Sequence, residues 1–336
     1  MNRQDIRPAS TWRFPRPYGV RSLLAAVLVL VVLVVTGKRV EIDRMVILNV
    51  QAVGALVDPR IDSQVDRGLA AVGHELWPMQ ISERTEVGRI EGLDRRHLPP
   101  FSHLQTIETV VQTLDPNTLR MVSRRERTEY LVQPYGYLEH VGIKLIETIE
   151  IALWGTLLAV LIGAPLAYLS ARNLTPFPII AFSARAVVGF FRAIPELISA
   201  LFLVLAYGFG PIAGVVALGV HAAGFLGKFF AEDVENADPE PQLALIAVGA
   251  NKLKVLRYAI LPQVMPQYIA YTLYILDRNV RMATVIGLVG AGGIGQELKG
   301  RYDMYNYHHV ATILVAIFLL VFALDQLAAR LRRSLL

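Results

Sequence analysis

Long, uninterrupted apolar blocks constrain the fold of this 336-residue chain more than any other feature of its sequence. The first block, residues 20–36, contains one charged residue, Arg21, near its start. A helix over that block is about 25 Å long, close to the least that crosses the apolar core of a bilayer. Later blocks occupy residues 145–169, 179–207, 212–230, 264–289 and 310–327. We therefore predict an all-α polytopic membrane protein, a helical bundle of about six spans.

The placement of charge orients these spans. Charged residues make up 18% of the chain and gather at the ends of the apolar blocks. The Lys and Arg residues do not form the continuous basic stripe that is typical of nucleic-acid-binding proteins, so we expect no nucleic-acid partner. Short positive segments mark the cytoplasmic side of a membrane protein, and here they are residues 1–21, 172–185, 252–257 and 330–333. We therefore expect a multi-pass protein of the plasma membrane, the inner membrane of a bacterium, with both termini in the cytoplasm.

Three regions follow from this topology. Residues 1–37 are predicted to form the cytoplasmic N-terminus and the first span. That span should stay uncleaved, because no small-x-small signal-peptidase site follows it. Residues 38–139 are predicted to form an extracytoplasmic insert, and residues 140–336 the transmembrane domain, with a cytoplasmic loop at 231–262.

The insert has two halves of different character. Apolar residues recur with helical spacing between Val46 and Val72. Residues 104–114 and 119–132 are rich in Thr and Val and are joined at Asp115-Pro116-Asn117, which is typical of two strands and a turn. The pattern predicts a small α+β insert on the outer side. Its role is either a spacer or lid, or a docking surface for a soluble partner.

Enzymatic chemistry has little support in this sequence. The chain has no cysteine, which excludes thiol catalysis, Fe–S clusters and thiolate zinc sites. It has no GxxxxGK[ST] motif to cradle ATP. His308 and His309 are adjacent and cannot share one helix face. We therefore expect no catalytic residue, no metal site and no cofactor in this chain.

A glycine-rich run near the C-terminus fits the GxGxxG pattern of nucleotide-binding loops. It follows an apolar span and has no βαβ unit around it, so we do not expect a nucleotide site. We expect instead close packing or a flexible gate where the last two spans meet. The glycines concerned are Gly290, Gly292, Gly293 and Gly295.

Ionisable and polar residues inside the spans are the most informative about function. Charge is costly in lipid, so such residues face the bundle interior or a watery path. The candidates for a translocation path are Arg192, Glu196, His221, Asp277, Arg278, Asn279 and Arg281.

Two interpretations of these residues stay open. Helical spacing of four allows ion pairs within one helix, Asp277 with Arg281 and Arg192 with Glu196, although Pro195 should kink the second helix. Such pairs would fix helix packing. Arg278 has no partner on its own helix, however, and the positive excess would suit a path for an anion. His221 is either a packed, hydrogen-bonded side chain or part of that path.

The cytoplasmic loop contains a short apolar helix. Asp238 can cap it, prolines follow in the first turn, and Gly249 can end it. Leu261 and Pro262 then begin the next span. A short apolar helix on this side of the membrane predicts insertion into a groove on a partner protein.

This loop resembles the EAA loop of ABC importer permeases, E-A-A-x3-G-x9-I-x-L-P. Ala244, Gly249, Leu261 and Pro262 match that pattern in register, whereas Leu243 stands at the glutamate position. The resemblance implies that the loop contacts an ATPase. The residues implied are Glu240, Gln242, Leu243, Ala244, Leu245, Gly249, Leu261 and Pro262.

Four runs, at residues 191–196, 249–253, 261–266 and 279–295, are similar to the permease subunit of phosphonate-type ABC importers. The resemblance covers about residues 140–336 and implies a type I ABC importer permease-like bundle in membrane lipid. It implies a homodimer, a cytoplasmic ABC ATPase dimer that holds ATP and Mg, and an extracytoplasmic substrate-binding protein. The cargo implied is phosphonate or a related oxyanion, phosphite or phosphate, moved by alternating access.

Two other functions compete with this one. The first is an ABC importer permease that transports another small solute, such as methionine, in place of an oxyanion. A membrane receptor or sensor would bind a ligand with residues 38–139, but it needs a cytoplasmic output domain, and the chain offers no long cytoplasmic segment for one.

Overall fold

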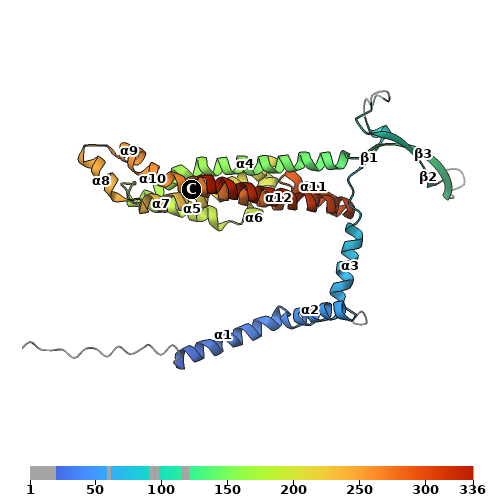
Figure 1. Cartoon of the computed structure of the whole chain (residues 1–336), viewed down its shortest axis with the longest axis horizontal. Coiled ribbons are helices and arrows are strands. Elements are labelled where there is room, and N and C mark those ends of the chain that lie inside the picture. Colours follow the sequence, from blue (N-terminus) through green and yellow to red (C-terminus); the bar gives the residue numbers. More distant parts are fainter. Residues whose placement is uncertain (1–19, 59–61, 91–94, 96–97, 115–120, 336) are drawn as a thin grey trace, which may run out of the picture. The chain divides into compact units, whose positions relative to one another are not determined.

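The computed structural model describes residues 20–335 except 59–61, 91–94, 96–97 and 115–120 (Figure 1). The chain divides into two compact units between His74 and Glu75. That division falls inside the predicted insert, so its helical half and its strand half belong to different units. The boundaries at 37 and 139 remain predictions about topology.

The first unit is helical. It contains α1 (Val20–Arg39), α2 (Ile42–Val57) and most of α3 (Gln64–Leu76). Glu41 joins α1 to α2 in the left-handed conformation, with φ 53°. The apolar side chains of α1 are exposed along its length, Leu28 by 65% and Leu33 by 61%. Such a surface suits a helix surrounded by lipid.

A three-stranded antiparallel sheet opens the second unit. It contains β1 (Glu83–Glu86), β2 (His103–Leu114) and β3 (Met121–Gln133), in the order β1-β3-β2, with a short 3-10 turn, Val87–Arg89, after β1. Leu104 pairs with Leu131 in the β2–β3 register. The two strands predicted from the Thr/Val-rich runs are thus confirmed. The predicted turn between them lies outside the described residues.

The rest of the second unit is a helical bundle. Its helices are α4 (Gly136–Ser170), α5 (Pro178–Ala193), α6 (Glu196–Tyr207), α7 (Pro211–Asn236), α8 (Pro239–Ala247), α9 (Lys252–Val255), α10 (Leu261–Gly287), α11 (Gly293–Asp303) and α12 (Tyr307–Leu335). A π-helical turn, Leu256–Ile260, joins α9 to α10. Helices α4, α5, α6 and α10 all pack against α7, which is the central helix (Figure 1).

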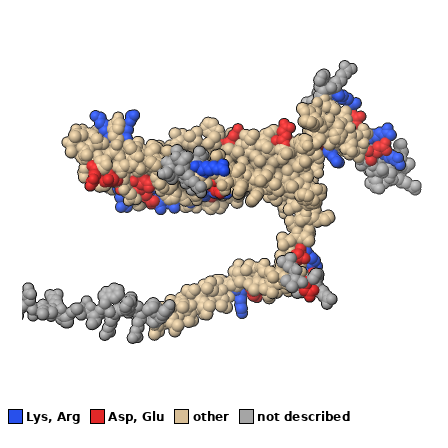
Figure 2. Space-filling view, viewed as in Figure 1, with Lys and Arg blue, Asp and Glu red and all other residues tan. Residues whose placement is uncertain are grey.

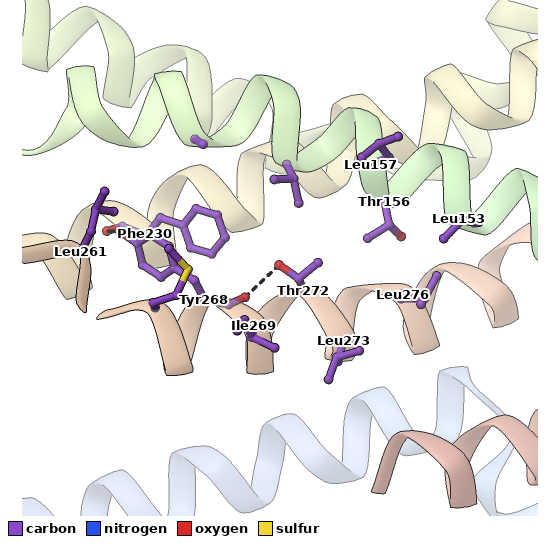
Figure 3. A pocket seen from close by; sticks show the side chains of 13 residues that line it. Leu153, Thr156, Leu157, Phe230, Leu261, Tyr268, Ile269, Thr272, Leu273 and Leu276 are labelled. Carbon is purple, nitrogen blue, oxygen red and sulfur yellow. Dashed lines mark hydrogen bonds between the residues drawn. The ribbon is translucent and has the colours of Figure 1, made fainter. Parts of the chain in front are cut away.

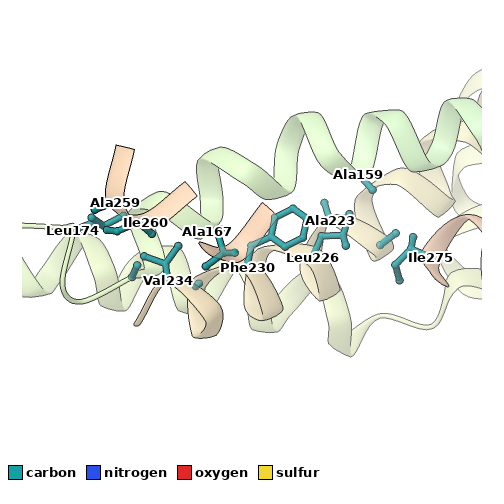
Figure 4. Packing of buried hydrophobic residues seen from close by; sticks show 14 of the residues in the cluster. Ala159, Ala167, Leu174, Ala223, Leu226, Phe230, Val234, Ala259, Ile260 and Ile275 are labelled. Carbon is teal, nitrogen blue, oxygen red and sulfur yellow. The ribbon is translucent and has the colours of Figure 1, made fainter. Parts of the chain in front are cut away.

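Small residues let α4 and α7 approach closely. A Cβ at Gly163 of α4 would lie 3.2 Å from the carbonyl oxygen of Ala223 and 3.2 Å from the Cβ of Leu226 on α7. Ala159 and Ala167, one turn away on either side, are buried in the same interface, where Phe230 fills the space between α7 and α10 (Figure 4). In a bilayer the lipid tails are as apolar as the helix surfaces, so the hydrophobic effect does not drive helices together, and close van der Waals packing of this kind stabilises their association instead.

The predicted single span at 179–207 is two helices. Helices α5 and α6 meet at Ile194 and Pro195 with a bend of 89°. Pro195 cannot donate the backbone hydrogen bond that would continue α5, so α5 ends and α6 begins at the next residue. The predicted kink is confirmed, and it is a full break.

Of the described helices, α1, α4, α7 and α12 are long and apolar enough to cross a membrane, and the bent pair α5–α6 would add a fifth span. Helix α10 has 27 residues but does not meet this test. It carries Asp277, Arg278 and Arg281 in its second half, with glutamines in its first. The predicted span at 264–289 is therefore a polar helix that borders other helices, not lipid alone.

The α4–α7 crossing generates a stability prediction. Gly163→Val should lower the free energy of unfolding by about 1–3 kcal/mol, because backbone and Cβ atoms of α7 occupy the space that the side chain needs. Gly142→Val is the matched control, since a Cβ at this position of the same helix would have nothing within 4 Å. Thermal unfolding of both purified variants would measure the difference, and equal midpoints would contradict the packing argument.

Candidate functional site

A buried ion cluster lies at the break between α5 and α6. Glu196 begins α6 directly after Pro195 and is 9% exposed. Its Oε1 accepts a hydrogen bond from Arg278 on α10 and lies 3.0 Å from the Nε2 of His221 on α7. Three helices therefore contribute one side chain each. We call Glu196, His221 and Arg278 the central cluster.

The break in the helix also supplies a partner for the histidine. The Nδ1 of His221 lies 2.9 Å from the carbonyl oxygen of Ile194. A carbonyl only accepts, so Nδ1 carries a proton and donates it. The Nε2 on the other side of the ring lies 3.3 Å from the Nη2 of Arg278 and faces Glu196. His221 is thus a hydrogen-bonded side chain that belongs to the same cluster as the candidate path residues.

Two guanidinium groups border one aromatic ring beside this cluster. Arg192 lies 5.0 Å from the ring centroid of Phe225, and Arg278 lies 5.1 Å from it. Both distances are within the range of cation–π attraction. Phe225 was missed by the sequence analysis, although it follows His221 by four residues and so lies on the same face of α7.

The structure corrects two expectations about pairing. Arg192 and Glu196 do not pair, because the 89° break removes the helical geometry that spacing of four requires. Arg278 does have a carboxylate partner, Glu196, from another helix. Among the residues described, the Nε of Arg192 and the Nη1 of Arg278 are buried without a hydrogen-bond partner. The positive excess is therefore present, and it lies at Arg192.

The other polar residues of α10 point to different neighbours. Arg281 donates to the buried Asp277 at 2.6 Å, which confirms the pairing predicted from their spacing. Asn279 is fully buried and donates to the Oγ1 of Thr156 on α4 at 2.9 Å. Asn279 thus ties α10 to α4, away from the central cluster.

A cavity of about 550 Å³ lies between α4, α7 and α10 (Figure 3). Its lining is apolar apart from the hydroxyls of Thr156, Tyr268 and Thr272. The Tyr268 hydroxyl donates to the carbonyl oxygen of Phe230 at 2.7 Å, and Thr272 donates to the carbonyl of Tyr268 at 2.8 Å. None of the described residues that line this cavity is charged, and its third hydroxyl, that of Thr156, donates to the carbonyl oxygen of Ala152 at 2.8 Å.

The glycine-rich run joins α10 to α11, a helix that the sequence analysis did not predict. Gly290, Gly292 and Gly293 have φ of 95°, 85° and 69°, the left-handed region that glycine tolerates. Gly293 donates its N–H to Glu147 at 3.0 Å, and a Cβ at Gly295 would lie 2.0 Å from the carbonyl oxygen of Thr284. The run is closely packed against its neighbours. A gating role remains a prediction.

The short helix predicted in the loop at 231–262 is present as α8. The side chain of Asp238 accepts from the N–H of Glu240 at 2.9 Å, which confirms the predicted cap. Gly249 follows the helix with φ 81°. The Gln242 amide donates to the carbonyl of Asp238 at 3.0 Å, so it is engaged within the helix, whereas Glu240 is exposed. Leu261 begins α10 with Pro262 in its first turn, as predicted.

The apolar residues of α8 that the resemblance implies in the ATPase contact are not equally exposed. Leu243, Ile246 and Val248 are exposed by 62%, 56% and 80%, and Ala244 is exposed as well. Leu245 is half-buried and packs against the core of the bundle. Lys and Arg side chains also gather at this end of the bundle, near α9 (Figure 2). Leu243 and Ile246 are therefore more accessible to a partner than Leu245. The coupling role of these residues remains a prediction.

Comparison with known proteins places these features in a wider context. Residues 160–336 match the family described as "Binding-protein-dependent transport system inner membrane component". The chain is 58% identical over 261 residues to the putative phosphite transport system permease protein HtxE of Stutzerimonas stutzeri, covering 78% of this chain and 100% of that relative. It is 42% identical over 189 residues to the phosphite transport system permease protein PtxC of the same organism, covering 56% of this chain and 69% of the relative.

The fold also matches a solved structure. An inward-facing form of the MetNI methionine ABC transporter superposes with a TM-score of 0.51 and 24% identity, covering 58% of this chain and 96% of that chain. Identity at this level supports the fold and leaves the cargo to other arguments.

The central cluster generates a prediction about energetics. Glu196→Ala should destabilise the fold by about 3 kcal/mol, because it leaves the Arg278 guanidinium without its carboxylate among apolar helices. Adding Arg278→Met should recover most of that loss, since the second change removes the unpaired charge. Thermal unfolding of the two single variants and the double variant measures this coupling. Strictly additive losses would show that the pair does not interact.

Proposed function

The chain belongs to the binding-protein-dependent transport system inner membrane component family, and from that premise we propose which cargo and partners it has. It is the permease component of an ABC importer, with the type I importer fold, and it is not itself the catalytic subunit. The proposed cargo is a phosphorus oxyanion, phosphite, phosphonate or phosphate, moved across the membrane by alternating access.

The positive excess buried among α5, α6, α7 and α10 carries this proposal. Two guanidiniums, Arg192 and Arg278, border Phe225, and one carboxylate, Glu196, lies with them. An oxyanion passing here would meet a favourable field, and guanidinium N–H groups can hydrogen-bond its oxygens. A modest excess also permits release, as transport requires. The phosphite cargo named for the 58% and 42% identical relatives supports the same class.

The proposed complex has several partners. A second copy of this chain would complete the path, and a cytoplasmic ABC ATPase dimer would bind ATP and Mg, for which this chain has no sequence motif. An extracytoplasmic binding protein would deliver the anion. In this proposal both termini and α8 lie in the cytoplasm of a bacterium, the insert lies outside, and the glycines at 290–295 form a gate.

The exposed face of α8 supports coupling to the ATPase. Ile246→Asp should reduce ATPase copurification and anion uptake at least tenfold, because burying an unpaired carboxylate in a protein groove costs several kcal/mol. The chain itself should unfold at the same temperature, since Ile246 is exposed. Phe101→Asp is the matched control, an 82% exposed apolar residue outside the bundle. Normal copurification of the Ile246→Asp variant would refute the docking role.

The proposed path also gives the anion a contact with Arg278, whose Nη1 has no hydrogen-bond partner among the described residues. Arg278→Gln should lower phosphite uptake by roughly tenfold, the loss of one charge-assisted hydrogen bond to the anion. Arg278→Lys keeps the charge and should retain most of the uptake. The assay uses the assembled transporter in proteoliposomes, with unfolding temperature as the check on folding. Full uptake by a folded Arg278→Gln variant would leave these charges a structural role alone.

A further inference from the structure

A second cavity, which is polar, lies at the end of α7 that leads into α8. It has a volume of about 320 Å³ and lies between the last residue of α4, the middle of α5 and the last turns of α7. The charged and hydroxyl groups that line it are Ser170, Arg185, Arg192, Lys228, Glu232 and Glu235. Three cations and two carboxylates give it an excess of one positive charge.

Both carboxylates of the cavity are already engaged. Glu235 accepts from the backbone N–H of Arg172 at 2.7 Å and from the guanidinium of Arg185. Glu232 lies 3.4 Å from the Nζ of Lys228, one turn away on α7. The Arg185 Nε donates to the carbonyl oxygen of Ser170 at 2.9 Å. Arg192 is therefore the cation of the cavity for which the described residues provide no carboxylate.

Two hydrogen-bond donors of the cavity lack acceptors. The Nε of Arg192 and the hydroxyl of Ser170 are buried without a partner among the described residues. Ser170 is only 2% exposed. A buried donor without an acceptor is destabilising, and an anion with several oxygens would satisfy both groups at once. A guanidinium, a hydroxyl and an ammonium are the donors that bind tetrahedral oxyanions in proteins.

A glycine on α7, Gly224, allows Arg192 to lie close to this helix. A Cβ at Gly224 of α7 would lie 2.8 Å from the Cγ of Arg192 and 3.0 Å from its backbone nitrogen. Only glycine at this position leaves room for the backbone and side chain of Arg192 to lie directly against α7. Since Arg192 also lies on the Phe225 ring, the cavity adjoins the central cluster.

We propose that this cavity binds the oxyanion of a phosphoryl group, with Arg192 and Ser170 as its donors and Lys228 as a further cation. Two sources share this chemistry. One is a free phosphate-like anion that leaves the central cluster along α7. The other is the headgroup of an anionic phospholipid, whose acyl chains would cover the exposed Ile179 and Phe182 of α5.

The test measures binding to the full-length chain purified in detergent without phospholipid. Orthophosphate is titrated in one arm by calorimetry, and phosphatidylglycerol is added in the other and detected by native mass spectrometry. Arg192→Gln should weaken binding at least tenfold, and Ser170→Ala about threefold to tenfold. Ser170→Ala should not lower the unfolding temperature without ligand, because its hydroxyl has no acceptor to lose. Arg89→Gln and Ser199→Ala are the matched controls, the first exposed and the second already bonded to the carbonyl of Pro195.

The possible outcomes distinguish a free anion from a lipid headgroup, and they test the cavity separately from the proposed transport function. Saturable binding of orthophosphate alone identifies a free anion, and binding of the lipid alone identifies a headgroup, provided that the two variants weaken it. Binding of neither probe, or binding that Ser170→Ala leaves unchanged, overturns the site. Should Arg192→Gln fail to fold, Ser170→Ala decides alone. The binding assay needs no ATP and no partner protein. A negative result would therefore refute the anion site in this cavity without refuting the proposed transport function, and a positive result would not depend on that function.

Discussion

The cost of burying charge among apolar helices governs this structure. Glu196, at 9% exposure, can stay ionised there only with partners, and the bundle provides His221 and Arg278 from two other helices. This shared carboxylate joins α6, α7 and α10 at one point. The break at Pro195 is part of the same arrangement, because it places Glu196 at the start of α6 and frees the Ile194 carbonyl for His221.

Local patterns in the sequence were enough to predict much of the bundle. Several features depend only on neighbours in the chain, and the structure agrees with them: the apolar blocks at 20–36, 145–169, 212–230 and 310–327, the Asp238 cap and the start of α10 at Leu261. The Asp277–Arg281 pair formed because α10 stays helical across it. Spacing of four failed for Arg192 and Glu196 because the helix ends between them. The rule therefore holds only where the backbone between two residues is continuous.

Contacts between helices could not be read from the sequence. The partner of Arg278 is 82 residues away, and nothing in the local pattern indicates it. Similarly, the inward side of α8 depends on how the helix lies on the bundle, so Leu245 and Ile246 could not be told apart beforehand. Helix α11 was missed because its sequence, rich in glycine and charge, lacks the apolar blocks on which the prediction rested.

Helix α7 connects the central cluster to α8. His221, Phe225, Lys228, Glu232 and Glu235 follow one another at alternating spacings of four and three, so they share one face of the helix. This face runs for about 21 Å from the central cluster to the end of the helix that leads into α8. The opposite sides of α7 are glycine and alanine packed against α4. A single continuous helix thus carries both the polar face and the connection to α8. In the proposed transport cycle, a movement of α8 would therefore be transmitted through α7 to the charges of the central cluster.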